Sequence, residues 1–342
     1  MTIKTGIVGL QSVFWPNAFA GCLHSISDAE FVACADMGYD PKLIQISLGS
    51  LPEVYAAQHA VTLYSDPIEM IQRENLDAVC ICAKHSEIVD FVEQVAPTGV
   101  GIYIAKPMAT TVEAAERIVK AVRDNGVIAT SGTTERFDGG IRAAYEQFKN
   151  GAIGELISIR TLHQHGNISG FPAEDWYWDE AQGGPELSLG WYVGDVVRWF
   201  AGAEVKRVYA EYDNYLSDNS PFMDNGKILI RFENNVMGSI DIYFSVKGWQ
   251  FPSYEVELVG TEGCLRTQQS TYEGTLFTRD GITNFYRTGN NNLLEEMRHW
   301  VQCCIAKTDP ELTIEDAHRV IELCLACRQS AQTHRPITLP PR

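Results

Sequence analysis

Short apolar runs alternate with helical patterns through the first part of the chain. Residues 78–82 are continuously apolar, which is typical of a strand buried on both faces. Residues 111–125 have apolar positions at helical spacing and end at Gly126, a common helix stop. Strands that alternate with helices predict βαβ units and a parallel sheet. Other strands are expected at residues 3–8, 30–35, 61–64, 100–105 and 127–131, and other helices at residues 18–26 and 87–95.

The pattern changes after about residue 132, where strands begin to follow one another directly. Such strands are expected at residues 156–165, 206–212, 227–232, 236–244, 254–259 and 264–268. Helices are expected at residues 141–150, 186–200, 293–304 and 314–332. Strands in series make an antiparallel sheet. We therefore predict an α/β domain in residues 1–131 and an α+β domain with a large, mostly antiparallel open sheet in residues 132–342.

Composition narrows the class of protein. The 342 residues carry a formal charge of −17 with no basic stripe, so nucleic acid is not an expected partner. No apolar run is long enough to span a bilayer, and no signal-peptide pattern precedes the first strand. The nine cysteines are typical of free thiols in a reducing compartment, so we expect a cytoplasmic protein. We interpret Cys324 and Cys327, the one CxxC, as helix packing and predict no metal site.

The first strand is followed by Gly9, a helix, a second strand and Asp36, which is the order of a dinucleotide-binding Rossmann domain. Gly9 allows close approach of the pyrophosphate, and Asp36 can accept both ribose hydroxyls and repel a 2′-phosphate. This predicts NAD rather than NADP, since no arginine follows Asp36 directly. The second and third fingerprint glycines are missing from residues 10–14, so a plain βαβ unit fits the pattern equally well.

Lys106 follows the strand expected at residues 100–105 and precedes Pro107. A lysine at the carboxyl end of a parallel strand points into the crevice where α/β sheets bind ligands. A solvated lysine at a strand end is the alternative.

A second group of polar residues lies in the helix expected at residues 186–200. Ser188, Tyr192 and Asp195 are spaced four and three apart and are expected to share one face of that helix. A serine, a phenol and a carboxylate on one face can line a substrate cleft; a buried tyrosine with a partner for its hydroxyl is the alternative. The core face is expected to hold Leu189, Val193, Val196 and Phe200.

Two further patterns suggest contacts with a polyol. His163 and His165 are two apart on an expected strand and so lie on one face, where they can hydrogen-bond hydroxyl groups. Trp178 ends an aromatic triplet that can cover the apolar face of a sugar. A polar patch on the sheet and a core tryptophan, respectively, explain the same residues.

Several motifs together resemble those of the Gfo/Idh/MocA oxidoreductases. They are Leu76 to Cys82 followed by His85, Ala105-Lys106-Pro107, Glu135 to Asp138, Gly151 to Glu155, Gly260 to Gly263 and Arg335 to Pro340. The resemblance covers nearly the whole chain. It implies NAD as the cofactor, with Gly9, Gln11, Ser12, Asp36, Cys82, His85 and Lys106 around it, and a second domain for substrate binding and oligomerisation. Gln11 and Ala105 depart from the family pattern.

The resemblance also locates the acid/base residue. Ser188 and Tyr192 stand where the family usually has an aspartate and a histidine, and some sugar oxidoreductases of the family have tyrosine there. A phenol has an ordinary pKa near ~10, which a nearby ammonium lowers. Tyr192 is therefore the candidate acid/base, assisted by Lys106; proton transfer by Lys106 itself is the alternative.

These patterns favour an NAD-dependent dehydrogenase that acts on a secondary alcohol or ketone of a sugar, polyol or related hydroxy compound. A non-catalytic NAD-binding sensor or regulator and an NAD-dependent glycosidase, both known in the family, are the alternatives. Relatives pair through the sheet of the second domain, which implies a homodimer or homotetramer. We expect Leu229, Ile240, Ile242 and Phe244 to supply the apolar surface for this pairing.

Overall fold

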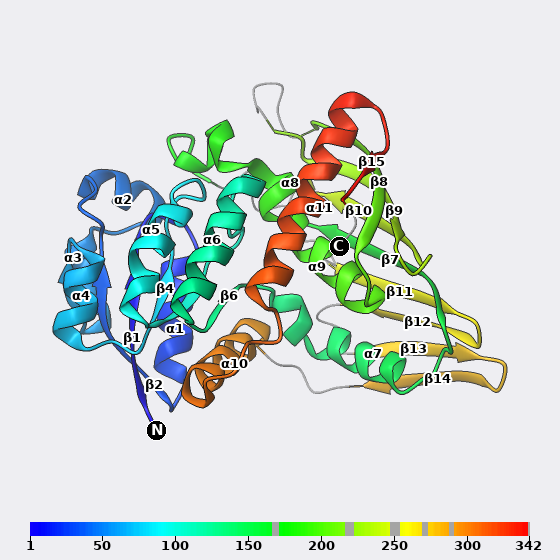
Figure 1. The fold of residues 1–342 in the computed structure, drawn as a ribbon, viewed down its shortest axis with the longest axis horizontal. Helices are drawn as coiled ribbons and strands as arrows, with labels where there is room; N and C mark the ends of the chain where they lie inside the picture. Colours follow the sequence, from blue (N-terminus) through cyan, green and yellow to red (C-terminus); the bar gives the residue numbers. More distant parts are fainter. Residues whose placement is uncertain (166–170, 216–221, 247–253, 269–272, 287–290, 341–342) are drawn as a thin grey trace. The chain divides into compact units, whose positions relative to one another are not determined.

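The computed structural model describes residues 1–165, 171–215, 222–246, 254–268, 273–286 and 291–340. The chain folds as two compact units (Figure 1). The first unit contains Met1–Gly132, Phe171–Gly183 and Leu293–Ile321. The second contains Thr133–Gly170, Gly184–Asn292 and Glu322–Arg342. The chain therefore passes between the units several times instead of crossing one boundary.

The first unit contains a six-stranded parallel sheet in the order β3-β2-β1-β4-β5-β6. Its strands are β1 (Ile3–Val8), β2 (Ala29–Ala35), β3 (Thr62–Tyr64), β4 (Ala78–Ile81), β5 (Gly101–Ile104) and β6 (Ala129–Ser131). This confirms the predicted Rossmann arrangement. The strand order reverses between β1 and β4, and in such sheets ligands bind outside the carboxyl ends of the strands at that point.

Helices cover this sheet, and three of them were not predicted from the sequence pattern. The expected helices are α1 (Trp15–Ser25), α5 (Ile88–Val95) and α6 (Val112–Asn125). The unexpected helices are α2 (Pro41–Leu48), α3 (Pro52–His59) and α4 (Pro67–Glu74). Each has eight residues, too few for a clear period, but each begins with proline, which is favoured at the first helical position.

A late helix, α10 (Asn292–Ala306), contributes to the core of the first unit. The ring of Trp300 lies edge-on to that of Tyr103 in β5, with centroids 5.5 Å apart. Gly101 lies against the same helix, because a Cβ atom there would be 2.5 Å from Sγ of Cys304. The start of β5 thus needs a residue without a side chain.

The second unit contains a nine-stranded sheet in the order β14-β13-β12-β11-β7-β10-β9-β8-β15. Among the strand pairs that the structure describes in this sheet, only β7–β10 is parallel, which confirms the mostly antiparallel sheet. Its strands are β7 (Leu156–Gln164), β8 (Val205–Asp213), β9 (Asn225–Phe232), β10 (Met237–Tyr243), β11 (Tyr254–Gly260), β12 (Gly263–Gln268), β13 (Glu273–Thr278), β14 (Gly281–Tyr286) and β15 (Ile337–Thr338). The last three were not predicted.

The helices of the second unit are α7 (Gly139–Lys149), α8 (Gly184–Ser188), α9 (Gly190–Ala201) and the second half of α11 (Ile314–Thr333). The helix predicted over residues 186–200 is therefore two helices that meet at Leu189, where glycine follows and weakens helical continuity. Leu189, Val193, Val196 and Phe200 are buried, as expected. Cys324 and Cys327 are buried in α11.

One expectation about the large sheet is wrong. Ile240, Ile242 and Phe244 are at most 2 % exposed and belong to the buried face. Leu229 pairs with Ser239, and residues opposite each other in neighbouring strands share a face. Leu229 is 62 % exposed and lies on the other face, because odd and even positions of a strand alternate.

Within the described residues, no helix has the length and apolar character needed to cross a membrane.

Candidate functional site

Gly9 lies where the strand order of the first unit reverses. Its φ of +85° is a conformation that side chains disfavour, and a Cβ atom there would be 2.8 Å from the carbonyl oxygen of Cys82. The loops that follow β1 and β4 therefore touch at this position. Only glycine allows this approach, at the place where a dinucleotide fold receives the pyrophosphate.

Gln11 and Ser12 lie in the loop between Gly9 and α1, and both are buried. Oγ of Ser12 accepts the N–H of Trp15 at 3.3 Å and so satisfies one donor at the start of α1. The side-chain oxygen of Gln11 has no hydrogen-bond partner among the described residues. A buried acceptor without a donor is costly, so this oxygen suits a ligand that supplies a hydroxyl or amide donor.

Asp36 follows β2 at the same edge of the sheet. Its Oδ1 accepts the N–H of Gly38 at 2.9 Å across a tight turn in which Met37 has a φ of +65°. The turn holds the carboxylate at the carboxyl end of β2. This is the position from which an acidic residue accepts ribose hydroxyls in dinucleotide folds.

A segment far along the chain completes this part of the first unit. We call residues Phe171–Gly183 the strap. Nε1 of Trp176 in the strap donates to the backbone oxygen of Gln11 at 2.7 Å. Oγ of Ser47, in α2, donates to Oδ2 of Asp175 at 2.6 Å. Trp178 donates from Nε1 to the backbone oxygen of Pro172 at 2.9 Å and so stabilises the strap itself.

His85, in the loop after β4, is tied to the strap. Its Nδ1 lies 2.7 Å from the backbone oxygen of Gln182. Because a carbonyl oxygen only accepts, Nδ1 carries the proton. Burial lowers the pKa of His85, the bond to Gln182 opposes this shift, and the charge of Lys106 adds a smaller decrease, so that the pKa is about 4. His85 is therefore neutral near pH 7.

Lys106 follows β5 and is only 7 % exposed, so the alternative of a solvated lysine is wrong. Its Nζ lies 5.6 Å from the ring centroid of Trp15, at the start of α1. The sequence pattern gave no reason to single out Trp15, because a tryptophan just past an incomplete glycine loop has no periodic or motif signal. Gln182 was missed because its partners His85 and Ser86 are far away in the sequence. Trp176 was considered only as a member of the aromatic triplet that can cover a sugar.

The second unit brings three predicted residues together. Tyr192 is half-buried in α9, and its ring lies edge-on to that of His163, with centroids 5.6 Å apart. The rings of His163 and His165 are 6.0 Å apart. Nδ1 of His163 lies 3.3 Å from the backbone oxygen of Leu189, at the junction of α8 and α9. Ser188, the last residue of α8, is buried.

Asp195 is fully buried and forms an ion pair. Its Oδ2 accepts from Nε of Arg136 at 2.7 Å and from Oγ1 of Thr133 at 2.5 Å. One helical turn earlier, the backbone oxygen of Tyr192 accepts from the hydroxyl of Tyr254 at 3.3 Å. Burial raises the pKa of Tyr254 well above its usual range, so this hydroxyl keeps its proton. Both contacts fix the backbone of α9 beside Tyr192.

The chain matches known protein families over both of its units. Residues 3–133 match the oxidoreductase family with an NAD-binding Rossmann fold, and residues 141–266 match the GFO/IDH/MocA C-terminal domain. The chain belongs to the Gfo/Idh/MocA oxidoreductases.

The relatives described next are distant in sequence but are matched over four fifths or more of their length. Myo-inositol 2-dehydrogenase of Thermotoga maritima is 22 % identical over 98 % of both chains. The scyllo-inositol 2-dehydrogenase (NAD(+)) of Bacillus subtilis is 26 % identical over 80 % of this chain and 81 % of its own. Levoglucosan dehydrogenase in complex with NADH and levoglucosan has a TM-score of 0.87 at 18 % identity, covering 99 % of this chain and all of its own. At that identity the structural match shows the fold.

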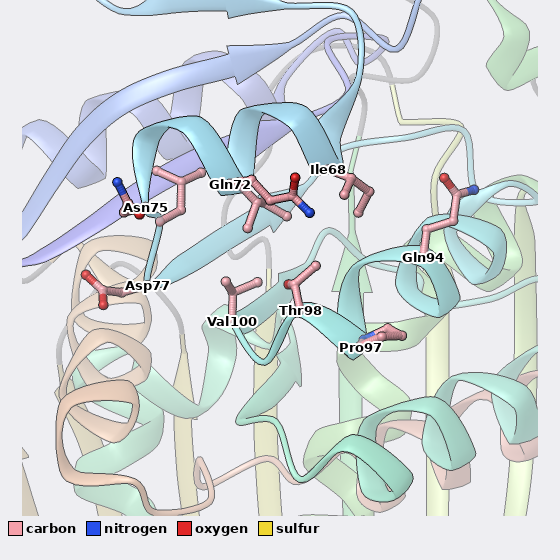
Figure 2. A pocket seen from close by; sticks show the side chains of 10 residues that line it. Ile68, Gln72, Asn75, Asp77, Gln94, Pro97, Thr98 and Val100 are labelled. Atoms are coloured by element: carbon pink, nitrogen blue, oxygen red, sulfur yellow. The ribbon is translucent and has the colours of Figure 1, made fainter.

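The first unit of this Gfo/Idh/MocA protein also has an open hollow of about 680 Å³. Figure 2 shows Ile68 and Gln72 from α4 on one side of it and Thr98 and Val100 on another. Asp77, which precedes β4, also lines the hollow. Asp77 and Val100 directly precede β4 and β5, at the amino ends of these strands, whereas Gly9 and Lys106 follow the carboxyl ends of β1 and β5. The hollow is therefore separate from the candidate cofactor site.

Proposed function

We propose that this protein is an NAD(H)-dependent dehydrogenase that interconverts a secondary alcohol and a ketone of a sugar or cyclic polyol. The observation that carries the proposal is Lys106, a buried ammonium at the carboxyl end of β5 in an NAD-binding Rossmann unit. Relatives named for inositol and D-apiose support the substrate class. A buried lysine provides donors that a hydroxyl or carbonyl oxygen can accept.

The residues of the first unit fit NAD. Gly9 allows the close approach of the pyrophosphate, Asp36 provides acceptors for ribose hydroxyls, and Gln11 provides a buried acceptor without a partner among the described residues. When bound, NAD supplies the hydride acceptor or donor. Asp36 is followed by Met37 and Gly38, neither of which can bind a 2′-phosphate through charge, so the proposal includes a preference for NAD(H) over NADP(H).

Tyr192 moves the proton in this proposal. As a phenolate it takes the proton of the substrate alcohol during oxidation, and as a phenol it returns that proton during reduction. The positive charge of Lys106 favours the phenolate, and its N–H groups orient the substrate oxygen. His163, His165 and Ser188 bind further hydroxyl groups of the substrate, and Asp195 acts through the backbone of α9 that it helps to fix. Direct proton transfer by Lys106 is the competing assignment.

The proposal also includes a cytoplasmic homodimer or homotetramer that pairs through the exposed face of the large sheet. Strand register aligns Ile282, Phe277 and Met237 in one row across this face, and all three are exposed. Leu229 lies on the same face. Light scattering at micromolar concentration tests the assembly; a monomer mass contradicts it.

An assay of the purified chain with NAD⁺ and a panel of inositols, aldoses and anhydrosugars tests the reaction. NADH absorbance that grows with at least one secondary alcohol, together with slower turnover with NADP⁺, is the expected result. Binding of NAD without turnover of any alcohol indicates a sensor instead. Cleavage of a glycoside without net NADH indicates a glycosidase.

A further inference from the structure

Trp15 occupies a position where the first unit brings an aromatic face against a buried ammonium. Nζ of Lys106 lies 5.6 Å from the centroid of the indole, and cations within about 6 Å of an aromatic face are attracted to it. Tryptophan is the most effective ring for this interaction. Lys106 is 7 % exposed, so little water screens the attraction.

The indole is held by a chain of ring contacts. It packs against Phe19 of α1, with centroids 5.2 Å apart, and Phe19 lies edge-on to Tyr103 at 5.0 Å. Tyr103 belongs to β5, the strand that Lys106 follows. The start of α1 and the end of β5 are therefore coupled by the same rings that place the indole beside Lys106.

His85, in the loop after β4, places no second positive charge beside Lys106. Burial and Lys106 itself both oppose protonation of His85, so the imidazole adds no competing charge near pH 7. An aromatic face attracts a cation without neutralising it, unlike a carboxylate. It also accepts no strong hydrogen bond, so the contact with the indole itself uses none of the N–H groups of Lys106.

We propose that Trp15 is a positioning residue: its indole face orients the ammonium of Lys106 toward the substrate oxygen and favours its charged form. The part of this inference that concerns substrate rests on the dehydrogenase function proposed above. The part that concerns the lysine does not, because it is a property of the chain without substrate.

Two substitutions separate this role from simple packing. Trp15→Leu keeps an apolar side chain and removes the aromatic face, whereas Trp15→Phe keeps a smaller face. We expect kcat to fall about 3- to 30-fold in Trp15→Leu and less in Trp15→Phe, with little change in NAD affinity. Phe14→Leu is the matched control, since it removes the 57 % exposed ring that lies edge-on to Trp15 at 5.0 Å and leaves the indole itself in place; its kcat should stay near the parent value.

A second measurement uses no substrate. Acetic anhydride reacts with neutral amines, so mass spectrometry of the Lys106 peptide reports how strongly the ammonium form is favoured. We expect Lys106 to be acetylated several-fold faster in Trp15→Leu than in the parent or in Phe14→Leu. Faster acetylation in a chain that oxidises no alcohol supports the inference and rejects the proposed function. Unchanged acetylation and kcat in a folded, active Trp15→Leu chain overturn the inference, as does a Trp15→Phe chain that is as impaired as Trp15→Leu.

Discussion

At the scale of single residues, the two positions that matter most for the proposed chemistry are Lys106 and Tyr192. We expect Tyr192→Phe to lose about 10²- to 10⁴-fold in kcat while NAD still binds, because the ring remains and only the acid/base group is removed. Lys106→Ala should lose at least as much, since a charge and a substrate contact disappear together. Steady-state kinetics and a NAD titration measure both effects.

The double variant of Lys106 and Tyr192 should be little worse than the poorer single variant, because groups that act as one unit are not additive. Ser188→Ala serves as the comparison and should cost much less, since a hydroxyl does not hold a charged partner as the family's usual aspartate does. Near-full turnover by Tyr192→Phe would assign the proton to Lys106 instead.

Gly9 allows a second prediction at this scale. Gly9→Ala places a Cβ atom 2.8 Å from a backbone oxygen and also forces a side chain into a left-handed conformation. Gly126 has a φ of +61° but open space around it, so Gly126→Ala measures the conformational cost alone, about 1–2 kcal/mol. Denaturant unfolding should show that Gly9→Ala lowers the free energy of unfolding more than Gly126→Ala does. Equal losses would mean that the loops after β1 and β4 do not constrain each other.

Sequence patterns located the candidate residues that carry a motif and missed those that depend on distant partners. Gly9, Asp36 and Lys106 were found because each ends a strand, which a local pattern reveals. Trp15 was not chosen, because its contact with Lys106 is encoded by no local period. Trp176 was considered only within an aromatic triplet, and its contact with Gln11 was not foreseen for the same reason. The ion pair of Asp195 with Arg136 likewise joins elements far apart in the sequence.

At the scale of elements, the contact between β5 and α10 makes a testable prediction. A Cβ atom at Gly101 would lie 2.5 Å from Sγ of Cys304, so Gly101→Ala should destabilise the first unit by about 1–3 kcal/mol through overpacking. Cys304→Ala removes the sulfur and should restore part of that loss in the double variant. Denaturant unfolding of the four chains forms a double-mutant cycle; additive losses would show that the two residues do not meet.

The elements that the sequence predicted well are those with a strong period or a continuous apolar run. Strand β4 is buried at every position, as its apolar run indicates, and α6 ends at Gly126 as expected. Helices α2 to α4 were missed because eight residues give no clear period. The junction at Leu189 was missed because helical spacing continues through it, and only the fold shows that His163 contacts its carbonyl oxygen.

At the scale of the whole molecule, each unit holds a buried ionisable group with a shifted pKa, and the two shifts oppose each other. In the first unit, burial lowers the pKa of His85 from its ordinary 6.5 to about 4. The folded chain then binds fewer protons than the unfolded chain at mildly acidic pH. The contribution of His85 to the free energy of unfolding is fully present above about pH 6.5. It falls by at most ~3 kcal/mol as pH decreases toward about 4.

In the second unit, burial raises the pKa of Glu186 from 4.5 to about 7, although Arg328 lies 3.1 Å from Oε1 and opposes the shift. The other carboxylate oxygen, Oε2, has no hydrogen-bond partner among the described residues, so nothing there compensates for its burial. The folded chain now binds more protons than the unfolded chain. The contribution of Glu186 to the free energy of unfolding is fully present below about pH 4.5 and is lost as pH rises through about 7.

Neutral substitutions isolate each contribution. Glu186→Gln cannot ionise, so its free energy of unfolding relative to the parent should rise by up to ~3 kcal/mol between about pH 4.5 and about pH 8. The free energy of unfolding of His85→Gln relative to the parent should rise as pH falls from about 6.5 to about 4. Because each comparison uses the change with pH and not the absolute value, a constant packing cost of either glutamine cancels. Denaturant unfolding across this range measures both curves. A variant whose curve runs parallel to that of the parent would show that its group has the same proton affinity in the folded and unfolded chain, and would remove that group from the pH dependence of stability.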